Sequence, residues 1–252
     1  MIPEMIRDGL NRAPTDRLPS DRLIVALDFP DTGAALALVD RLHGATRWFK
    51  VGLELYIAEG NSLVAELKRR GYSIFLDLKL HDIPNTVASA VRAVTHLGVD
   101  MLTVHAAGGP EMIAAAVGAA ESRLSLLAVT VLTSMDAVQL EAIGVIETPA
   151  AQVERLATMA LACGVGGLVC SPNEVASLRK RFGNEPLLVI PGIRSEGADV
   201  GDQRRVATPA AAIASGASYL VVGRPITRAV DPEAAARAIL ADMQSGIEIG
   251  QA

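Results

Sequence analysis

The sequence predicts a single-domain (β/α)8 TIM barrel, and three observations lead to this prediction. Eight short, nearly continuous apolar segments alternate with longer amphipathic segments along the 252 residues. Such segments are typical of parallel strands covered by helices on both faces. No linker or change of composition divides the chain. An open, doubly wound sheet is the main alternative, but it usually has a glycine-rich loop after its first strand, and here that strand leads into "DFP".

The expected strands are short and rich in β-branched and other apolar residues. In order along the chain they are residues 23–27, 48–51, 73–78, 101–104, 126–132, 167–170, 187–190 and 219–222. Eight strands, each followed by a helical segment, in about 250 residues match the number and length that a closed barrel requires.

The segments between these strands carry signals for the starts of helices. Asp31 is expected to cap the first helix, Asn61 or Ser62 the next, and Asn85 a third. Short polar side chains suit these positions because they accept hydrogen bonds from amides of the first helical turn. Residues 231–233, "DPE", combine the cap, the proline and the acidic residue that are typical where a helix begins.

The first 20 residues are polar, and we expect them to form an extension ahead of a barrel domain at 21–252. They lack the apolar core of a signal peptide. No apolar run in the chain reaches the roughly 18 residues needed to span a bilayer. We therefore expect a cytoplasmic protein that does not enter a membrane.

Composition and spacing argue against several kinds of ligand. The formal net charge of -5 gives no electrostatic reason to expect nucleic-acid binding, which needs a basic patch. Cys163 and Cys170 form neither a metal-type cluster nor a disulfide framework, and we expect buried thiols. No spacing of histidine, cysteine and acidic residues predicts a metal site. His81 and His105 lie near strand ends, but the pattern assigns no role to either.

Polar residues gather at the carboxyl ends of the expected strands, where a (β/α)8 barrel has its active site. The starts of the strands show no comparable concentration of acid–base groups. The residues at the carboxyl ends are Asp28, Lys50, Asp77, Lys79, His105, Thr133, Ser134, Ser171, Arg194 and Arg224. This asymmetry indicates an enzyme.

The stretch "FLDLKLHDIP" places Asp77, Lys79 and Asp82 close together in the sequence. Residues at i and i+2 of a strand share a face, so Asp77 and Lys79 are expected to point together into the mouth of the barrel, beside Lys50. Two ammoniums and two carboxylates would keep one another charged. Asp82 falls in the loop and is expected to reach inward or toward a partner subunit. A solvated surface cluster is the alternative, disfavoured because these residues interrupt strand cores.

The loops after the last two strands have the character of a phosphate site. Glycines in "PGIR" and "GRP" let backbone amides approach a ligand closely, and Arg194 and Arg224 add charged donors. The same two strands hold a substrate phosphate in many barrels. Gln203, in the long loop between them, is expected to lie in a lid. The alternative is a pair of surface arginines beside turn glycines.

The motif Asp77-x-Lys79-x-x-Asp82 resembles that of the orotidine 5'-phosphate decarboxylase family. Six further segments resemble other blocks of that family in the same order. They are "ALD" (26–28), "FKVG" (49–52), "VLTS" (131–134), "PGIR" (191–194), "GDQ" (201–203) and "VVGRPI" (221–226). The resemblance covers roughly residues 22–240.

This resemblance implies that a homodimer decarboxylates orotidine 5'-phosphate to UMP without a cofactor. It implies that Lys79 donates a proton to C6 of the pyrimidine and that Asp77 lies beside the departing carboxylate. Lys50 and Asp82 would complete the charged array, with Asp82 coming from the other subunit. The substrate-binding residues implied in the same way are Asp28 and Lys50 for the ribose, Thr86 from the partner subunit, Thr133 and Ser134 for the pyrimidine, and Arg194, Gln203, Gly223 and Arg224 for the phosphate.

Two other functions compete with this interpretation. Sugar-phosphate decarboxylases and aldolases resemble the same barrel and motif, but they use Mg²⁺ and resemble a pattern with an acidic residue where this chain has Lys50. An ammonium there would repel Mg²⁺. A non-catalytic nucleotide-binding barrel is the second alternative, and it would have little need for four charged residues at the strand ends.

Overall fold

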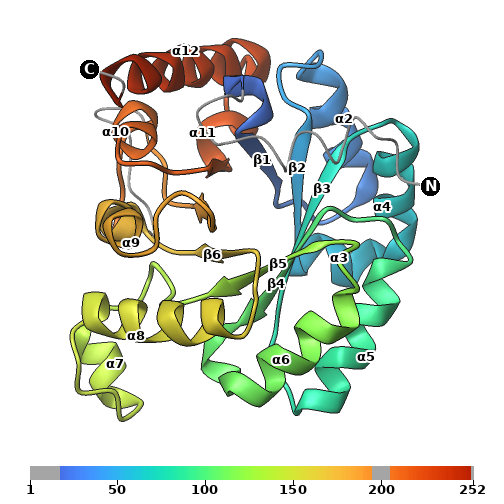
Figure 1. Ribbon diagram of the computed structural model, residues 1–252. Coiled ribbons are helices and arrows are strands. Elements are labelled where there is room, and N and C mark those ends of the chain that lie inside the picture. The colour runs from blue at the N-terminus through green and yellow to red at the C-terminus, as the bar shows by residue number, and fades with distance from the viewer. Residues whose placement is uncertain (1–17, 195–204, 251–252) are drawn as a thin grey trace.

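The structure is a computed structural model that describes residues 18–194 and 205–250 (Figure 1). Eight parallel strands close into a barrel in sequence order, and β1 pairs with both β2 and β8. The strands are β1 (Leu23–Leu27), β2 (Trp48–Gly52), β3 (Ser73–Leu80), β4 (Met101–His105), β5 (Ser125–Val129), β6 (Gly167–Val169), β7 (Leu187–Ile190) and β8 (Tyr219–Val222). The predicted (β/α)8 barrel is confirmed.

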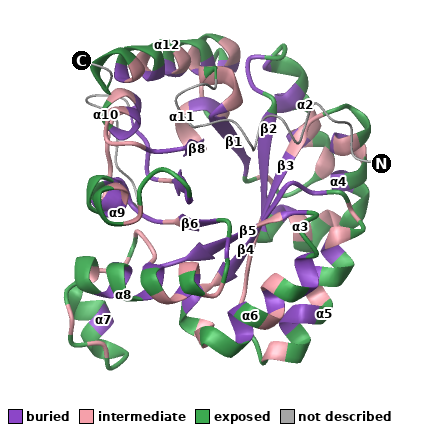
Figure 2. Ribbon diagram, in the orientation of Figure 1, coloured by how far each residue is buried: buried purple, intermediate pink, exposed green. Residues whose placement is uncertain are grey.

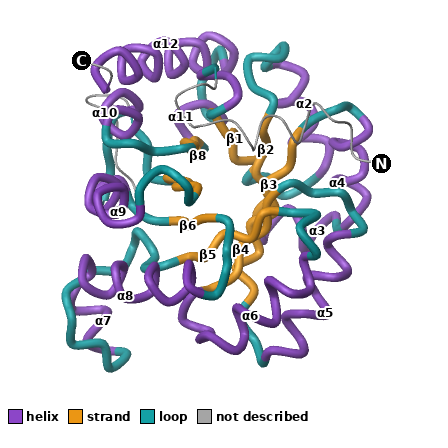
Figure 3. The backbone as a smooth tube through the Cα atoms, viewed as in Figure 1, coloured by secondary structure: helices purple, strands orange, loops and turns teal. Residues whose placement is uncertain are grey.

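The helices lie around the strands, which occupy the centre of the molecule (Figure 3). They are α2 (Thr32–Arg41), α3 (Leu53–Glu59), α4 (Asn61–Arg69), α5 (Pro84–Thr95), α6 (Gly109–Ala120), α7 (Ala137–Ala142), α8 (Pro149–Ala162), α9 (Val175–Phe182), α10 (Pro209–Ala214), α11 (Arg224–Thr227) and α12 (Pro232–Gly250). The described residues also form the short 3-10 helices η2 (Pro19–Asp21), η3 (Ala106–Gly108) and η4 (Pro172–Glu174). None of these described helices combines the length and the apolarity needed to cross a membrane.

The strands are formed largely of buried residues (Figure 2). Their apolar side chains belong to two buried clusters, one on each face of the strands. Along β1, Ile24 and Ala26 belong to the cluster inside the barrel, while Leu23, Val25 and Leu27 pack with the helices. This is the alternation that a pleated strand imposes. Because both faces are buried, the strand sequences read as continuous apolar runs, which is the pattern that predicted the fold.

Aromatic side chains fill the amino end of the barrel. The rings of Trp48 and Tyr219 meet edge to face with their centroids 5.2 Å apart, and both residues are buried. An edge-to-face pair adds about 0.5–1.5 kcal/mol beyond the burial of its area. A barrel closed by side chains at this end leaves its carboxyl end for a ligand.

Two of the predicted helix caps are confirmed. The Asp31 carboxylate accepts a hydrogen bond from the amide of Ala34 at 2.8 Å, and α2 begins at the next residue. The Asp231 carboxylate accepts from the amide of Ala234 at 3.0 Å, directly before α12. Each such cap is worth about 1 kcal/mol.

The other two cap predictions are wrong. Helix α4 begins at Asn61 itself, whose side chain instead accepts a hydrogen bond from the Tyr56 hydroxyl, and the Ser62 hydroxyl donates to a backbone carbonyl. Helix α5 begins one residue before Asn85, at Pro84, whose ring fixes a helical φ and removes an amide that would need a cap. Of the expected N-terminal extension, residues 1–17 lie outside the described residues, and Pro19–Asp21 forms η2 ahead of β1.

Candidate active site

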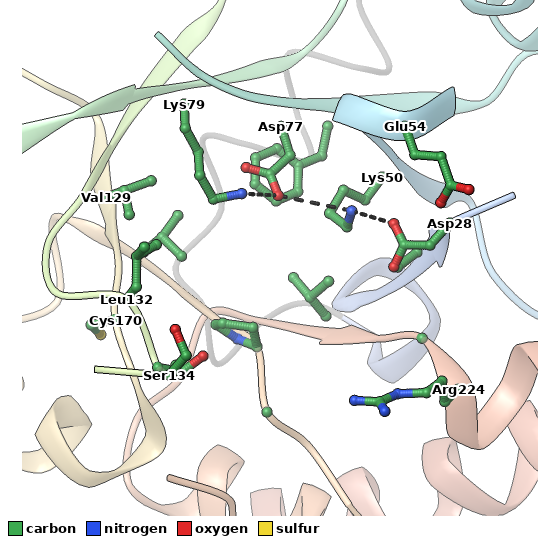
Figure 4. Close-up of a pocket in the computed structure, with 18 of the residues that line it drawn as sticks. Asp28, Lys50, Glu54, Asp77, Lys79, Val129, Leu132, Ser134, Cys170 and Arg224 are labelled. Carbon is green, nitrogen blue, oxygen red and sulfur yellow. Dashed lines mark hydrogen bonds and ion pairs between the residues drawn. The ribbon is translucent and has the colours of Figure 1, made fainter. Parts of the chain in front are cut away.

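A cavity of about 650 Å³ lies at the carboxyl ends of the strands (Figure 4). A volume of this size is typical of small-molecule sites. The sequence-predicted residues on its lining are Asp28, Lys50, Asp77, Lys79, Thr133, Ser134, Arg194, Gly223 and Arg224. The carboxyl end of the barrel, where the sequence predicted the active site, therefore contains a cavity. Its lining combines side chains from strands and loops that are far apart in the sequence.

Four charged side chains form a continuous chain of alternating sign along one wall of the cavity (Figure 4). The ammonium of Lys79 lies 2.8 Å from Asp77 Oδ2, and the ammonium of Lys50 lies 3.8 Å from the same oxygen. Lys50 also donates to Asp28 Oδ1 at 2.8 Å. Within one subunit Asp28 is thus the fourth member of the array, and the place of Asp82, expected from the other subunit, stays a prediction.

The four charges differ in how far they are removed from solvent. The side chains of Lys50 and Asp77 are 11% and 13% exposed, whereas those of Lys79 and Asp28 are 32% and 58% exposed. A buried charge is tolerated only when an opposite charge or hydrogen bonds compensate it. Lys50 and Asp77 are therefore the two charges that most need their partners in the array, and Asp28 lies at its solvent side.

Strand β3 reaches the cavity through an irregularity and not as a regular strand. Leu76 pairs with Leu102 of β4, but the next paired residues are Leu80 and Val104, so β3 advances four residues while β4 advances two. Lys79 lies in this bulge with a φ of 50°, in the left-handed region. Asp77 and Lys79 do meet in the cavity, as expected, but simple strand alternation does not describe the path between them.

Gly52, the last residue of β2, leaves room for the ammonium of Lys50. A Cβ at this position would lie 2.7 Å from Lys50 Nζ and 3.3 Å from Asp28 Oδ1. Real Cβ atoms essentially never approach another atom to within 3.0 Å. The glycine in "FKVG" therefore belongs to the site, because any side chain here would displace the Lys50 ammonium.

The opposite side of the cavity is formed by the ends of β7 and β8. Gly192 has a φ of 77°, and the loop after β7 is held by a bridge between Ile193 and Ala207. The amide of Arg194 donates to the Ala207 carbonyl at 3.0 Å, and its guanidinium donates to the carbonyl of Ile193. Arg194 is buried, while Arg224 begins α11 directly after Gly223. Both arginines line the cavity, on the side opposite the four alternating charged side chains.

Residues 21–239 match the profile of the "Orotidine 5'-phosphate decarboxylase / HUMPS family". The chain belongs to this family. The proteins most similar to it include "Orotidine 5'-phosphate decarboxylase" of Halorhodospira halophila, with 55% identity over 88% of this chain and 95% of the relative. The protein of the same name from Anaeromyxobacter sp. (strain K) is 53% identical over 89% of this chain and 99% of the relative.

A solved structure leads to the same family. The crystal structure of orotidine 5'-phosphate decarboxylase from Lactobacillus acidophilus superimposes with a TM-score of 0.79 and 41% identity, covering 88% of this chain and 98% of that one. The resemblance seen in the sequence motifs and the fold of the structure therefore agree on the orotidine 5'-phosphate decarboxylase family.

Two described residues that the family resemblance singled out, Asp82 and Thr86, do not line the cavity of this subunit. Asp82 is exposed, and its carboxylate accepts a hydrogen bond from the amide of Ile83 at 2.6 Å. Thr86 is exposed on the first turn of α5. Gln203 lies outside the described residues, so its place in a lid stays a prediction.

The two histidines near the strand ends stack on each other beside the site. The rings of His81 and His105 are 5.4 Å apart at an angle of 23°, and neither lines the cavity. Burial lowers the pKa of His105, and the charges of His81 and Lys79 lower it further. All three effects favour the neutral form of the His105 ring.

Some residues at or near the cavity have no counterpart in the predictions, and Glu54, Arg205 and Thr103 are polar ones with defined contacts or positions. Glu54, at the start of α3, lines the cavity near Asp28. Arg205 pairs with buried Glu174 and donates to the carbonyls of residues 131 and 132 at 3.2 and 3.0 Å, which fixes the loop after β5. Thr103 is a buried polar residue in the middle of β4 that contacts both Asp77 and Lys79. A lone hydroxyl within the apolar run "MLTV" was the signal that could have drawn attention to Thr103.

Proposed function

We propose that this protein catalyses the cofactor-independent decarboxylation of orotidine 5'-phosphate to UMP in pyrimidine biosynthesis. Membership of the family and relatives of that name at more than 50% identity support the reaction. The alternating chain Lys79–Asp77–Lys50–Asp28 is the observation that carries the proposal. It supplies an acid, fixed charges and a polar wall in one cavity, which is what a reaction through a carbanion needs.

Lys79 is the proton donor in this proposal. When the bond between C6 and the carboxylate carbon breaks, CO₂ leaves and the electron pair remains on C6 of the pyrimidine. The ring cannot readily delocalise that pair, so the Lys79 ammonium stabilises it electrostatically and then transfers a proton to C6. The neutral amine regains its proton from water. Its 2.8 Å hydrogen bond to Asp77 Oδ2 fixes the position of the ammonium before the reaction.

Asp77 has two tasks in the proposed reaction. It orients Lys79, and its charge repels the carboxylate of the bound substrate. That repulsion disappears as neutral CO₂ departs, so Asp77 destabilises the bound substrate more than the transition state. Lys50, between Asp77 and Asp28, keeps this arrangement of charges intact.

The remaining residues bind the parts of the substrate that do not react. We assign Asp28 and Lys50 to the ribose hydroxyls, Thr133 and Ser134 to the pyrimidine, and Arg194, Gln203, Gly223 and Arg224 to the phosphate. The positions of the described members of this set around one cavity support the assignment. Binding energy from the distant phosphate can lower the chemical barrier, so a substrate without phosphate should lose turnover as well as affinity.

Lys50 favours this reaction over a Mg²⁺-dependent one on the same fold. A divalent cation needs carboxylate oxygens that are free to coordinate it. Here the ammonium of Lys50 lies against both Asp28 and Asp77 and neutralises the two carboxylates nearest to it. Among residues 18–194 and 205–250, no three histidine, cysteine or acidic side chains converge as a metal site requires.

We further propose a homodimer in which Asp82 and Thr86 complete the partner's site. Both residues are exposed, Asp82 in the loop after β3 and Thr86 on the first turn of α5, and Ile83 between them is 67% exposed, which suits a surface that a second subunit covers. The cytoplasmic location expected from the sequence also stays a prediction, which fractionation of cells would test.

The deciding experiment adds purified protein to orotidine 5'-phosphate in the presence of EDTA and follows the absorbance of the orotate chromophore. Loss of the chromophore with formation of UMP and CO₂ is the expected result. An unchanged absorbance would overturn the proposal. Activity that appears only when Mg²⁺ is restored would point to the sugar-phosphate branch instead.

A further inference from the structure

The bulge in β3 lies opposite one residue of β4. Leu76 pairs with Leu102, and Leu80 pairs with Val104, so residues 77–79 face the single position 103 between them. In a regular ladder, backbone groups of the two strands would pair along this stretch. The extra residues of a bulge leave some of these groups without a backbone partner.

The side chain of Thr103 takes over the missing pairing. Its hydroxyl oxygen accepts a hydrogen bond from the Lys79 amide at 2.8 Å, and the hydroxyl donates to Asp77 Oδ1 at 3.0 Å. Thr103 is fully buried and does not line the cavity. One hydroxyl therefore binds both charged residues of the motif, and its donor and acceptor roles are both in use.

These two hydrogen bonds fix different parts of the charged pair. With Oδ1 held by Thr103, the rotation of the Asp77 carboxylate is set, and Oδ2 is the oxygen that meets the ammonium of Lys79 at 2.8 Å. The bond to the Lys79 amide holds the backbone in its left-handed conformation, with a φ of 50°. A non-glycine residue keeps such a conformation only where its surroundings enforce it.

We infer that Thr103 is a positioning residue that sets the orientation of Asp77 and Lys79 relative to each other. It acts through these two residues and does not touch the substrate. The inference rests on the proposed decarboxylation, because it concerns the geometry of the proposed proton donor. A misplacement of about 1 Å at a reacting group can lower a rate by about 100-fold.

The test compares three substitutions of buried threonine in the full-length protein. Thr103→Val keeps the shape and removes both hydrogen bonds, whereas Thr103→Ser keeps the hydroxyl. Thr46→Val is the matched control, because Thr46 is also buried but lies at the opposite end of the barrel. Its hydroxyl accepts a hydrogen bond from the Trp48 amide and donates one to the Leu23 carbonyl. The readouts are kcat and KM for orotidine 5'-phosphate, the Kd for UMP and the melting temperature.

We expect Thr103→Val to lower kcat by about 10- to 100-fold, with much smaller changes in KM and in the affinity for UMP. Thr103→Ser should restore most of kcat. Thr46→Val should lower the melting temperature to a similar degree as Thr103→Val, since both lose the same kind of hydrogen bonds, but keep kcat.

Three results would overturn the inference: a wild-type kcat in Thr103→Val, an equal loss of kcat in Thr46→Val, or a kcat in Thr103→Ser as low as in Thr103→Val. If Thr103→Val does not fold, Thr103→Cys replaces it, because a thiol is a weak donor and acceptor. A wild-type kcat in that variant overturns the inference in the same way. If the wild-type protein leaves orotidine 5'-phosphate unchanged, the proposed function fails and the inference fails with it.

Discussion

Replacing Gly52 with alanine should reduce activity without reducing stability. The backbone at this position has a φ of -95°, which alanine adopts freely. The new Cβ would lie 2.7 Å from Lys50 Nζ, whereas ordinary contacts begin at about 3.4 Å. The ammonium must therefore move by roughly 0.7 Å, away from the position where it meets Asp28 and Asp77.

A displacement of this size should cost about 10- to 100-fold in kcat/KM, which corresponds to about 1.4–2.7 kcal/mol of transition-state stabilisation. The end of a lysine side chain moves easily, so the melting temperature should change little. The assay is the initial rate of loss of the orotate absorbance, measured together with thermal unfolding.

Gly118→Ala provides the control for this prediction. Gly118 lies on α6, and nothing lies within 4 Å of an added Cβ. Alanine in a helix is more favourable than glycine by roughly 0.5–1 kcal/mol, so this variant should be slightly more stable and fully active. Wild-type kcat/KM in Gly52→Ala would refute the reasoning, because it would mean that the position of the Lys50 ammonium does not matter. A large loss of stability would refute it as well.

Three further predictions concern the acid, the subunits and pH. Lys79→Ala should abolish turnover while the protein folds and binds UMP; substantial turnover would remove Lys79 from the role of proton donor. Mixing inactive Lys79→Ala and Asp82→Ala dimers should restore some activity, since a hybrid has one intact site if Asp82 serves the partner; no recovery after verified subunit exchange would argue against a shared site. Because burial lowers the pKa of His105, the folded protein resists a proton that the unfolded chain accepts below its ordinary pKa of about 6.5. The melting temperature should therefore decrease as the pH is lowered from about 7 to about 5, and it should decrease less in His105→Gln. An equal decrease of the melting temperature in the two proteins would contradict this.

The barrel could be predicted because each strand carries its own local signal. Strand β1 runs over the residues expected, and β7 and β8 do so too. The expected strand at 126–132 instead ends at Val129, and the residues after it form a loop that lines the cavity. An apolar run is the same whether its later residues face a helix or a ligand, so the sequence does not mark where such a strand stops.

The parts of the site that the sequence did not predict depend on pairs of elements. The bulge in β3 is a property of its register with β4, and "FLDLKL" alone contains no sign of it. Thr103 gains its importance only from lying opposite that bulge. In the same way, Asp28 was assigned to the ribose from the resemblance, but its contact with Lys50 depends on how β1 and β2 align. Asparagine is a residue type that often caps helices, but at Asn61 and Asn85 neighbouring residues define where the helices begin.

Beyond the bulge, β3 pairs with β4 again at Leu80 and Val104, and this affects how the protein can change in evolution. Asp77 and Lys79 lie in the bulge, and the backbone pairing of β3 with β4 is present on both sides of it. Substitutions within residues 77–79 can therefore alter the chemistry while the neighbouring pairing remains in place. Such changes of side chain leave the backbone pairs Leu76–Leu102 and Leu80–Val104 to β4 and Gly52–Asp77 to β2 available to hold β3 in the barrel.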